Sequence, residues 1–395
     1  MLEATLRDRV RSLLTPSGRS QVPPFMVMDV MAAAARIEAA GGHVIHMEVG
    51  QPAASAPKAA IAAAHAALDG GRIDYTSALG TPSLRERIAR HYRETYGCAV
   101  DAERIVVTTG SSGAFILGFL AMFEPGDRVA VTVPGYPPYR HILTALGCEP
   151  VLIETSSETR HALTGEALLA AHRRTPLKGV LVGSPANPTG TMMSREALTG
   201  LMSAAEGAGI RFISDEIYHG LDYAFPAVTA AELSPHALVI NSFSKYFCMT
   251  GWRVGWMVAP EPLVRPIERL QQNLAISVPT LSQIAAEAAF EGREEMEAVK
   301  RGYQENRRIL IAGLPQAGLN KFLPADGAFY LYADVSAFTS DSFEFAKQML
   351  EQARVAATPG IDFDPVHGHQ FIRFSYARSA GEMREAVARI ARWLG

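Results

Sequence analysis

Residues 241–255 read Asn-Ser-Phe-Ser-Lys-Tyr-Phe-Cys-Met-Thr-Gly-Trp-Arg-Val-Gly, and the apolar runs Ala237–Ile240 and Trp256–Ala259 flank them. This pattern predicts a strand that delivers Lys245 into apolar and hydroxyl-bearing surroundings. Burying an unpaired lysine is costly, so the placement is unusual. A desolvated amine is more easily neutral and nucleophilic, which suits a lysine that forms a Schiff base.

The same stretch offers groups that suit a phosphate. They are the hydroxyls of Ser242 and Ser244 and the guanidinium of Arg253. The alternative is an exposed lysine in a loop that follows a strand. Residues 241–255 taken alone favour that alternative over a Schiff-base lysine.

The regions around this stretch show a regular pattern from residue 103 to residue 260. Short β-branched apolar runs recur, and helical segments separate many of them. Strands that are apolar throughout and alternate with helices predict an α/β fold, with a mainly parallel sheet covered on both faces. Seven runs qualify as strands: residues 105–108, 129–133, 150–153, 179–182, 210–213, 238–240 and 254–258.

Two flanking regions have a different character and predict a smaller α+β domain. After residue 260 come long helical segments, over 281–292 and 294–313, followed by alternating strands and helices. Before residue 42 the pattern is helical, and Ser83 is expected to cap a helix that runs to Tyr96. We therefore expect a large domain over residues 49–290 and a small domain formed by residues 1–48 and 291–395.

A glycine-rich turn, Gly110-Ser111-Ser112-Gly113, separates a predicted strand from an apolar helix. Backbone N–H groups at such a helix start hold anions, and glycine permits close approach. The turn matches neither of the common nucleotide-binding glycine motifs. Phosphate binding and simple helix capping are about equally supported here.

Polar residues also follow other predicted strands, at the carboxyl ends where open parallel sheets bind ligands. Asp215 comes directly after an apolar strand, where a carboxylate needs a cation or strong hydrogen bonds. It suits the protonated ring nitrogen of a pyridoxal cofactor, although a helix N-cap is an alternative. Tyr218 is placed to reach the same ring, and Tyr136 follows another strand. Asn187 lies between two prolines, which either fix its amide deliberately or simply form a turn.

Arg373 lies on a predicted strand among apolar and aromatic neighbours. A guanidinium in that setting suits bidentate capture of a carboxylate. An edge-strand arginine that reaches water explains the pattern equally well.

Composition excludes several classes of function. The net charge is −3 and the pI is about 6.4, with no basic cluster, so no nucleic-acid partner is expected. The three cysteines form no CxxC pair, which argues against a disulfide framework and against a metal site. The longest apolar run, residues 113–123, is too short to cross a membrane. Residues 1–9 lack an apolar signal-peptide core, so a cytoplasmic location is the expectation.

The motifs, taken in order, resemble the class I/II pyridoxal-phosphate aminotransferases of fold type I. The most specific piece is Ser242-x-Ser-Lys-x-x-Cys-x-x-Gly-x-Arg-x-Gly255, supported by Asn187-Pro-x-Gly190 and Asp215-x-x-Tyr218. The resemblance covers nearly the whole chain. It implies pyridoxal 5′-phosphate as cofactor, and ping-pong transfer of an amino group from an amino acid to a 2-oxo acid.

The resemblance also implies a role for each residue. Lys245 corresponds to the Schiff-base lysine that moves a proton during the reaction, and Asp215 to the partner of the pyridine nitrogen. Tyr218 and Asn187 correspond to the pair that bonds the phenolic oxygen. The remaining correspondences are a stacked ring for Tyr136, a phosphate site for Ser111, Ser112, Ser242, Ser244 and Arg253, and substrate carboxylate binding for Arg373 and the Gly50 backbone.

Tyr75 resembles a tyrosine that reaches the phosphate of the neighbouring subunit, which implies a homodimer. Cys248 stands where the family prefers a smaller or more inert residue, a mild departure. Ser112 stands where a branch active on acidic amino acids carries a lysine, and a second substrate arginine is not evident. The resemblance therefore does not support specificity for acidic substrates.

Two other functions fit parts of the pattern. A pyridoxal-phosphate-dependent carbon–sulfur β-lyase uses the same lysine, aspartate and arginine, so the motifs do not separate it from a transaminase. A ligand-sensing domain of a transcription regulator needs a winged-helix segment, whereas only some forty residues precede the Gly50 loop.

Overall fold

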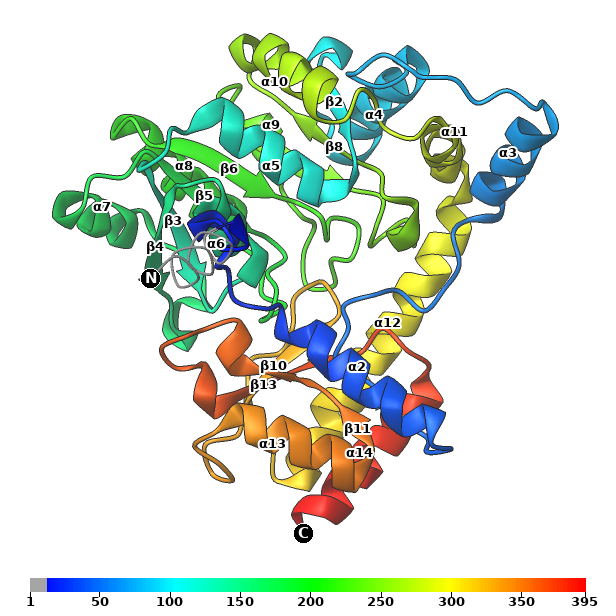
Figure 1. The fold of residues 1–395 in the computed structure, drawn as a ribbon. Helices are drawn as coiled ribbons and strands as arrows, with labels where there is room; N and C mark the ends of the chain where they lie inside the picture. The colour runs from blue at the N-terminus through cyan, green and yellow to red at the C-terminus, as the bar shows by residue number, and fades with distance from the viewer. Residues whose placement is uncertain (1–12) are drawn as a thin grey trace, which may run out of the picture.

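A seven-stranded sheet forms the centre of the larger part of the molecule in the computed structural model, which describes residues 13–395 (Figure 1). One strand, β8, runs antiparallel to both of its neighbours, and the other pairs are parallel. The predicted mainly parallel α/β sheet is therefore confirmed. In spatial order the strands are β2 (Ile105–Thr108), β8 (Gly255–Val258), β7 (Leu238–Ser242), β6 (Arg211–Asp215), β5 (Gly179–Gly183), β3 (Arg128–Val133) and β4 (Glu149–Glu154).

Both faces of this sheet are buried, which explains why its strands are apolar throughout. Successive residues alternate between two cores: Val180 and Val239 face one, and Leu181 and Ile240 face the other. Helices α4, α7 and α8 cover the first face, and α5, α6 and α10 cover the second. The helices of this part are α3 (Lys58–Asp69), α4 (Pro82–Tyr96), α5 (Gly110–Met122), α6 (Pro137–Ala145), α7 (Gly165–Arg174), α8 (Arg195–Gly207), α9 (Ala230–Leu233), α10 (Glu261–Leu274) and α11 (Thr280–Ala289).

The sequence analysis misplaced the start of helix α4 and missed helices α9 and α10. Helix α4 begins at Pro82, and its cap is Thr81, whose Oγ1 accepts a hydrogen bond from Leu84 N at 3.4 Å, so Ser83 is not the cap. Helix α10 was not predicted. Its apolar face is narrow, with Ile267 as a fully buried apolar residue, and Pro266 lies inside it.

The smaller part packs helices on a four-stranded antiparallel sheet (Figure 1, lower half). The N-terminal region joins it, because Ile45 of β1 pairs with Val355 of β11. Its elements are α2 (Met26–Ala39), β1 (Ile45–His46), α12 (Arg293–Gly313), β9 (Lys321–Phe322), β10 (Tyr330–Asp334), α13 (Ser342–Gln348), β11 (Val355–Ala356), β12 (Thr358–Pro359), β13 (Phe371–Ser375) and α14 (Ala380–Leu394).

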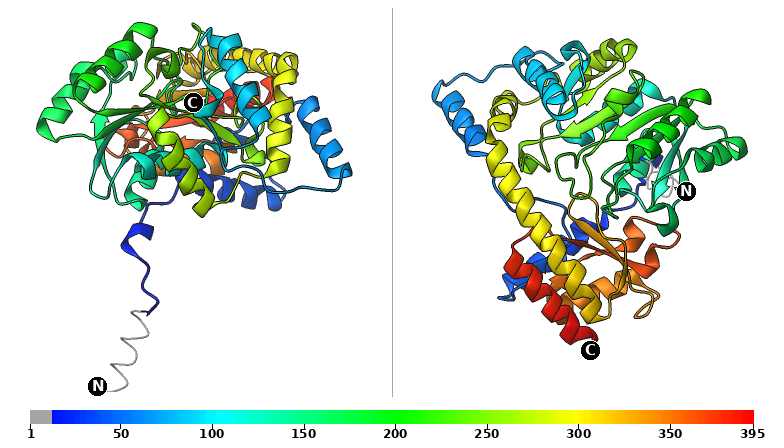
Figure 2. Two further views of the ribbon diagram at one scale, coloured as in Figure 1. Left: turned by 90° about the horizontal axis from the view of Figure 1, so that it is seen from above. Right: turned by 180° about the vertical axis from the view of Figure 1, so that it is seen from behind.

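Helix α12 connects the two parts, as both the front and the rear views show (Figures 1 and 2). Near its start, Met296 packs in the core of the large sheet, whereas Tyr303 and Leu310 pack in the core of the smaller part. This packing supports a proposed division into a large domain of residues 49–290 and a small domain of residues 1–48 and 291–395. The expectations that concern residues 1–12 lie outside the described residues.

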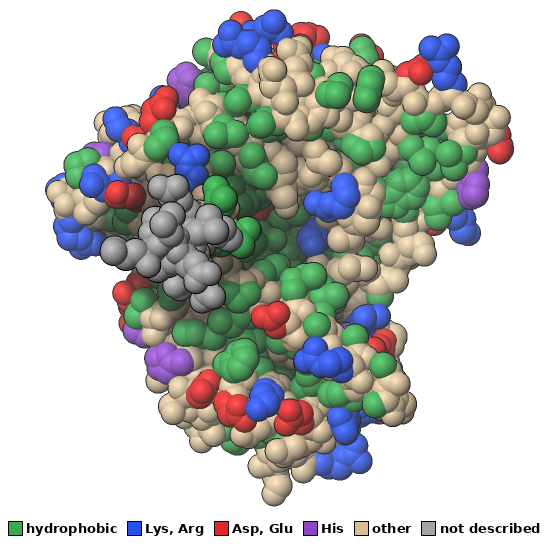
Figure 3. Space-filling view, viewed as in Figure 1, with side chains coloured by type: hydrophobic (Ala, Val, Ile, Leu, Met, Phe, Trp, Pro, Cys, Tyr) green, Lys and Arg blue, Asp and Glu red, His purple; other side chains and the backbone are tan. Residues whose placement is uncertain are grey.

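The face between the two parts is hollowed, with basic side chains in the hollow (Figure 3). The parallel strands of the large sheet direct their carboxyl ends to one edge, so the polar residues that follow them meet there. None of the described helices is long and apolar enough to cross a bilayer.

The backbone is closely packed around Gly255, and a substitution there tests this packing. A Cβ there would lie 2.8 Å from Asn241 O and 3.1 Å from Ser111 N, and both are backbone atoms. We expect Gly255→Ala to lower the free energy of unfolding by about 1–3 kcal/mol, the usual cost of overpacking. The measurement is the urea midpoint followed by tryptophan fluorescence. Gly251→Ala is the control, since a Cβ at Gly251 meets nothing within 4 Å; equal midpoints for the two variants would contradict the prediction.

Candidate active site

One cavity of about 220 Å³ gathers the predicted site residues at the carboxyl edge of the large sheet. All of them line it except Ser242 and Tyr75. The residues that the cavity brings together are Gly50, Ser111, Ser112, Tyr136, Asn187, Asp215, Tyr218, Ser244, Lys245, Arg253 and Arg373. They come from segments up to 323 positions apart in the sequence, so tertiary folding alone unites them.

Lys245 follows β7 and directs its amine into this cavity. Its Nζ donates a hydrogen bond to Gly50 O at 2.5 Å and lies 5.8 Å from the centre of the Tyr218 ring. Burial, together with the charges of Arg373 and Arg253, lowers the pKa of Lys245 to about 8, although the charge of Asp215 opposes this shift. A substantial fraction of neutral, nucleophilic amine is therefore present in mildly alkaline solution.

Asp215, the last residue of β6, is 4% exposed. Its Oδ2 accepts a short hydrogen bond from the Tyr139 hydroxyl, and its Oδ1 accepts one from Ile217 N at 3.0 Å. Burial outweighs these bonds and raises the pKa of Asp215 to about 6. Among the described residues no basic side chain forms an ion pair with it, so the carboxylate lacks a cation.

The start of α5 and the loop before β8 form a basic, donor-rich corner of the cavity. Gly110 has a φ of +69°, and a Cβ there would lie 2.5 Å from Arg253 Nη2, so only glycine lets the guanidinium sit against the helix start. Ser111 and Ser112 occupy the first turn of α5. Their backbone N–H groups, the helix dipole and Arg253 together favour a bound anion.

Ser242 and Tyr75 do not line the cavity. Ser242 lies behind Ser244, with the two Oγ atoms 2.8 Å apart, and also donates to Val254 O at 3.2 Å. Its hydroxyl is therefore bonded within the protein, and the phosphate contact of Ser242 stays a prediction. Tyr75 is 79% exposed, outside the cavity of its own chain.

Arg373 on β13 is held rigidly at the opposite wall. Its Nη1 donates to Asn187 Oδ1 at 2.9 Å, and its Nη2 donates to Glu48 O. The guanidinium lies between the rings of Tyr330 and Phe363, at 4.4 and 4.7 Å from their centres. Its plane is therefore fixed before any carboxylate arrives, which reduces the entropic cost of binding.

Several lining residues were not predicted from the sequence. Tyr139 was available as a signal, because it stands three positions after Tyr136 on the first turn of α6. Tyr330, whose hydroxyl lies 2.7 Å from that of Tyr218, carried no such signal. Other unpredicted lining residues are Phe25, Val27, Met28, Val49, Gln51, Ile217 and Thr250.

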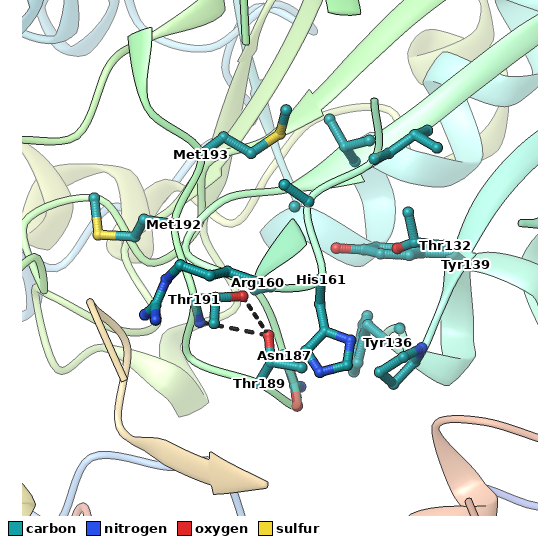
Figure 4. A pocket seen from close by; sticks show the side chains of 17 residues that line it. Thr132, Tyr136, Tyr139, Arg160, His161, Asn187, Thr189, Thr191, Met192 and Met193 are labelled. Carbon is teal, nitrogen blue, oxygen red and sulfur yellow. Dashed lines mark hydrogen bonds between the residues drawn. The ribbon is translucent and has the colours of Figure 1, made fainter. Parts of the chain in front are cut away.

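A smaller cavity of about 30 Å³ shares Tyr136 and Asn187 with the first cavity (Figure 4). It has room for about two water molecules. The hydroxyls of Thr189 and Thr191 lie 2.7 Å apart on its wall and fold the loop that presents Asn187.

Comparison with known proteins adds independent findings. A model of the family "Aminotransferase class I and II" matches residues 42–390. A valine–pyruvate aminotransferase of Mycobacterium tuberculosis is 48% identical over 380 residues, which are 95% of this chain and 97% of the relative. The crystal structure of an aminotransferase from that organism has a TM-score of 0.94 and 47% identity, covering 96% of this chain and 99% of its own.

A more distant solved structure shows the same fold. Aspartate aminotransferase from Thermus thermophilus with maleate has a TM-score of 0.89 at 32% identity, covering 96% of this chain and 99% of its own.

The hydroxyl of Tyr139 tests the electrostatics of Asp215. Its hydrogen bond favours the ionised carboxylate, so Tyr139→Phe should raise the pKa of Asp215 above about 6 in cofactor-free protein. Carbon-13 NMR titration of labelled aspartate side chains measures the change. Tyr332→Phe is the control, because it removes a buried hydroxyl that does not line the cavity and that bonds to Gly360 O at 3.5 Å. An unchanged or lower pKa in Tyr139→Phe would refute this account of Asp215.

Proposed function

This chain belongs to the class I and II aminotransferases, and we propose that the cavity around Lys245 is its active site, with pyridoxal 5′-phosphate as the cofactor. The enzyme transfers an amino group between an amino acid and a 2-oxo acid. The observation that supports the site best is the convergence of Lys245, Asp215 and Arg373 in one cavity. These groups match the three needs of the reaction: an amine, an anion for a ring nitrogen, and a cation for a substrate carboxylate.

The residues present fit the cofactor. Asp215 is a buried carboxylate without a cation, which a protonated pyridine nitrogen would supply. The corner formed by Gly110, Ser111 and Arg253 would hold the phosphate. When bound, the cofactor supplies an electron sink that stabilises negative charge at the substrate Cα.

Lys245 is the proposed acid–base group. Its lowered pKa of about 8 lets Nζ hold or release a proton near neutral pH, as efficient proton transfer requires. The hydrogen bond to Gly50 O shows that Nζ lies beside the segment proposed to face the substrate carboxylate. Tyr218 and Asn187 would orient the cofactor ring through the phenol and the amide.

Arg373 would bind the substrate α-carboxylate. Its Nε is buried and has no hydrogen-bond partner, and Nη1 is shared with a single amide oxygen, that of Asn187. Donor capacity is thus left at the guanidinium for a carboxylate.

We propose neutral aliphatic amino acids as the donor class and pyruvate as an acceptor. The relative with 48% identity is a valine–pyruvate aminotransferase. Among the described residues, the basic side chains that line the cavity are Lys245, Arg253 and Arg373, and each has a proposed role. Apolar side chains, including those of Phe25, Val27 and Ile217, also line the cavity.

A homodimer is also proposed. Tyr75 is 79% exposed in the single chain, which leaves its phenol free to reach the phosphate site of a partner subunit. In a two-fold arrangement each subunit would contribute one such tyrosine to the other.

Replacing the lysine tests the chemistry. We expect Lys245→Ala to lower kcat for amino transfer by several orders of magnitude, because Nζ is the proposed proton carrier. The assay follows valine consumption with pyruvate as acceptor. Lys347→Ala, at a lysine with a half-exposed side chain, should match wild type. A Lys245→Ala enzyme with wild-type rates would eliminate this assignment.

A stopped-flow half-reaction screen tests the substrate class. Valine should convert the holoenzyme at least about tenfold more efficiently than aspartate, whose second carboxylate would be desolvated without a partner. The readout is the rate of the cofactor spectral change for each amino acid. Met28→Arg adds a cation at the cavity wall, so it should reduce the preference for valine over aspartate. Faster conversion of aspartate by the wild-type enzyme would disprove the aliphatic assignment.

A further inference from the structure

The catalytic segments also line a second cavity. It measures about 200 Å³ and lies behind the active site, against helix α4 and the first turns of α12. His219 and Tyr246 line it, and these are the chain neighbours of Tyr218 and Lys245 in the active-site cavity. The turns that follow β6 and β7 therefore contribute residues to both cavities.

The floor of the second cavity is aromatic. The rings of Phe247, Trp256 and Phe290 line it. Arg87 from α4 lies over Phe290, with Cζ 4.2 Å from the ring centre. An organic molecule with a flat apolar body would therefore find complementary surface here.

The acidic groups around this cavity already have partners. Glu94 accepts from Arg87 Nη1 at 3.3 Å, and Asp222 pairs with Lys300 at 3.4 Å. Glu297 accepts a hydrogen bond from the Tyr246 hydroxyl at 2.6 Å. Each of these carboxylates is thus already bonded to one donor of this chain.

Donors, by contrast, remain unused. Asn241 is only 5% exposed; its Oδ1 accepts from Ser242 N, but its amide nitrogen has no partner within the described chain. Arg293, at the rim, makes no hydrogen bond or ion pair with any described residue. Arg87 Nε is buried without a hydrogen-bond partner, and Glu291 Oε1 is 3.9 Å away. The unused donors of Asn241 and Arg293 suit an anion.

We propose that this cavity is a second binding site, for a small organic carboxylate. The carboxylate would bind Arg293 and Arg87, its polar edge would accept from Asn241, and its apolar body would rest on the aromatic floor. Asn241 lies three to four positions before Ser244 and Lys245, and His219 directly follows Tyr218. An occupant would thus touch the segments that hold the catalytic groups.

Calorimetric titration of benzoate into the holoenzyme tests the proposal. The active site is first blocked with aminooxyacetate, which caps the cofactor and places its own carboxylate at Arg373. This block depends on the proposed function. The cofactor spectrum shows whether aminooxyacetate has reacted, and calorimetry shows whether benzoate binds. A failed block is therefore distinguishable from a missing second site. We expect one benzoate per chain, and about tenfold weaker binding in Arg293→Gln because a charged hydrogen bond is lost.

Arg301→Gln is the matched control, since Arg301 is exposed on the same helix and does not line the cavity. It should bind benzoate like wild type. No binding by the blocked wild-type enzyme, equal binding by Arg293→Gln, or an equal loss in Arg301→Gln would each overturn the site. Displacement of benzoate by an equal concentration of inorganic phosphate would overturn the carboxylate class.

Discussion

The burial of Asp215 without a cation is the constraint on which the site depends. A carboxylate that is 4% exposed is costly unless a positive charge or strong donors compensate it. The fold supplies one phenol and one backbone N–H, and the pKa of Asp215 still rises to about 6. A cationic ring nitrogen would relieve this penalty, so cofactor binding and stability of the folded chain are coupled. The phenol comes from Tyr139, on the first turn of α6, so the position of this helix also affects the charge state of Asp215.

Glu216, the residue that follows Asp215, is also a buried acid but has different hydrogen-bond partners. Glu216 points away from Asp215, and its Oε1 accepts from Ala230 N at 2.7 Å and from Ser214 Oγ at 3.0 Å. Burial raises the pKa of Glu216 to about 7. Backbone bonding from Glu216 N to Ile240 O ties this turn to the strand that leads to Lys245. The carboxyl edge is therefore a rigid platform that positions Asp215 and Lys245 relative to each other.

The strands of the buried sheet and the residues at their ends could be predicted from the sequence. Residues that other parts of the fold bring to the cavity could not. Strands such as 179–183 were evident because burial on both faces makes them apolar throughout. Asp215 and Asn187 were found because strand ends form the ligand edge. Tyr330 and Met28 were not, because they reach the cavity from the small part and only the folded chain shows it. The resemblance assigns Ser242 a phosphate contact, and only the folded chain shows that its hydroxyl also bonds to that of Ser244.

The arrangement separates the residue proposed to bind the substrate carboxylate from the residues proposed to select the substrate side chain. Arg373 is fixed by Asn187, by the backbone of Glu48 and by two aromatic rings, so its position does not depend on the residues proposed to face the substrate side chain. Those residues, such as Val27 and Met28, lie at the start of α2, which packs on the small part. Substitutions there are expected to alter the shape and polarity of the pocket, because Val27 and Met28 line it. The proposed chemical centre would thereby be compatible with different substrates, which would explain why the motifs around Lys245 predict the reaction but not the amino acid.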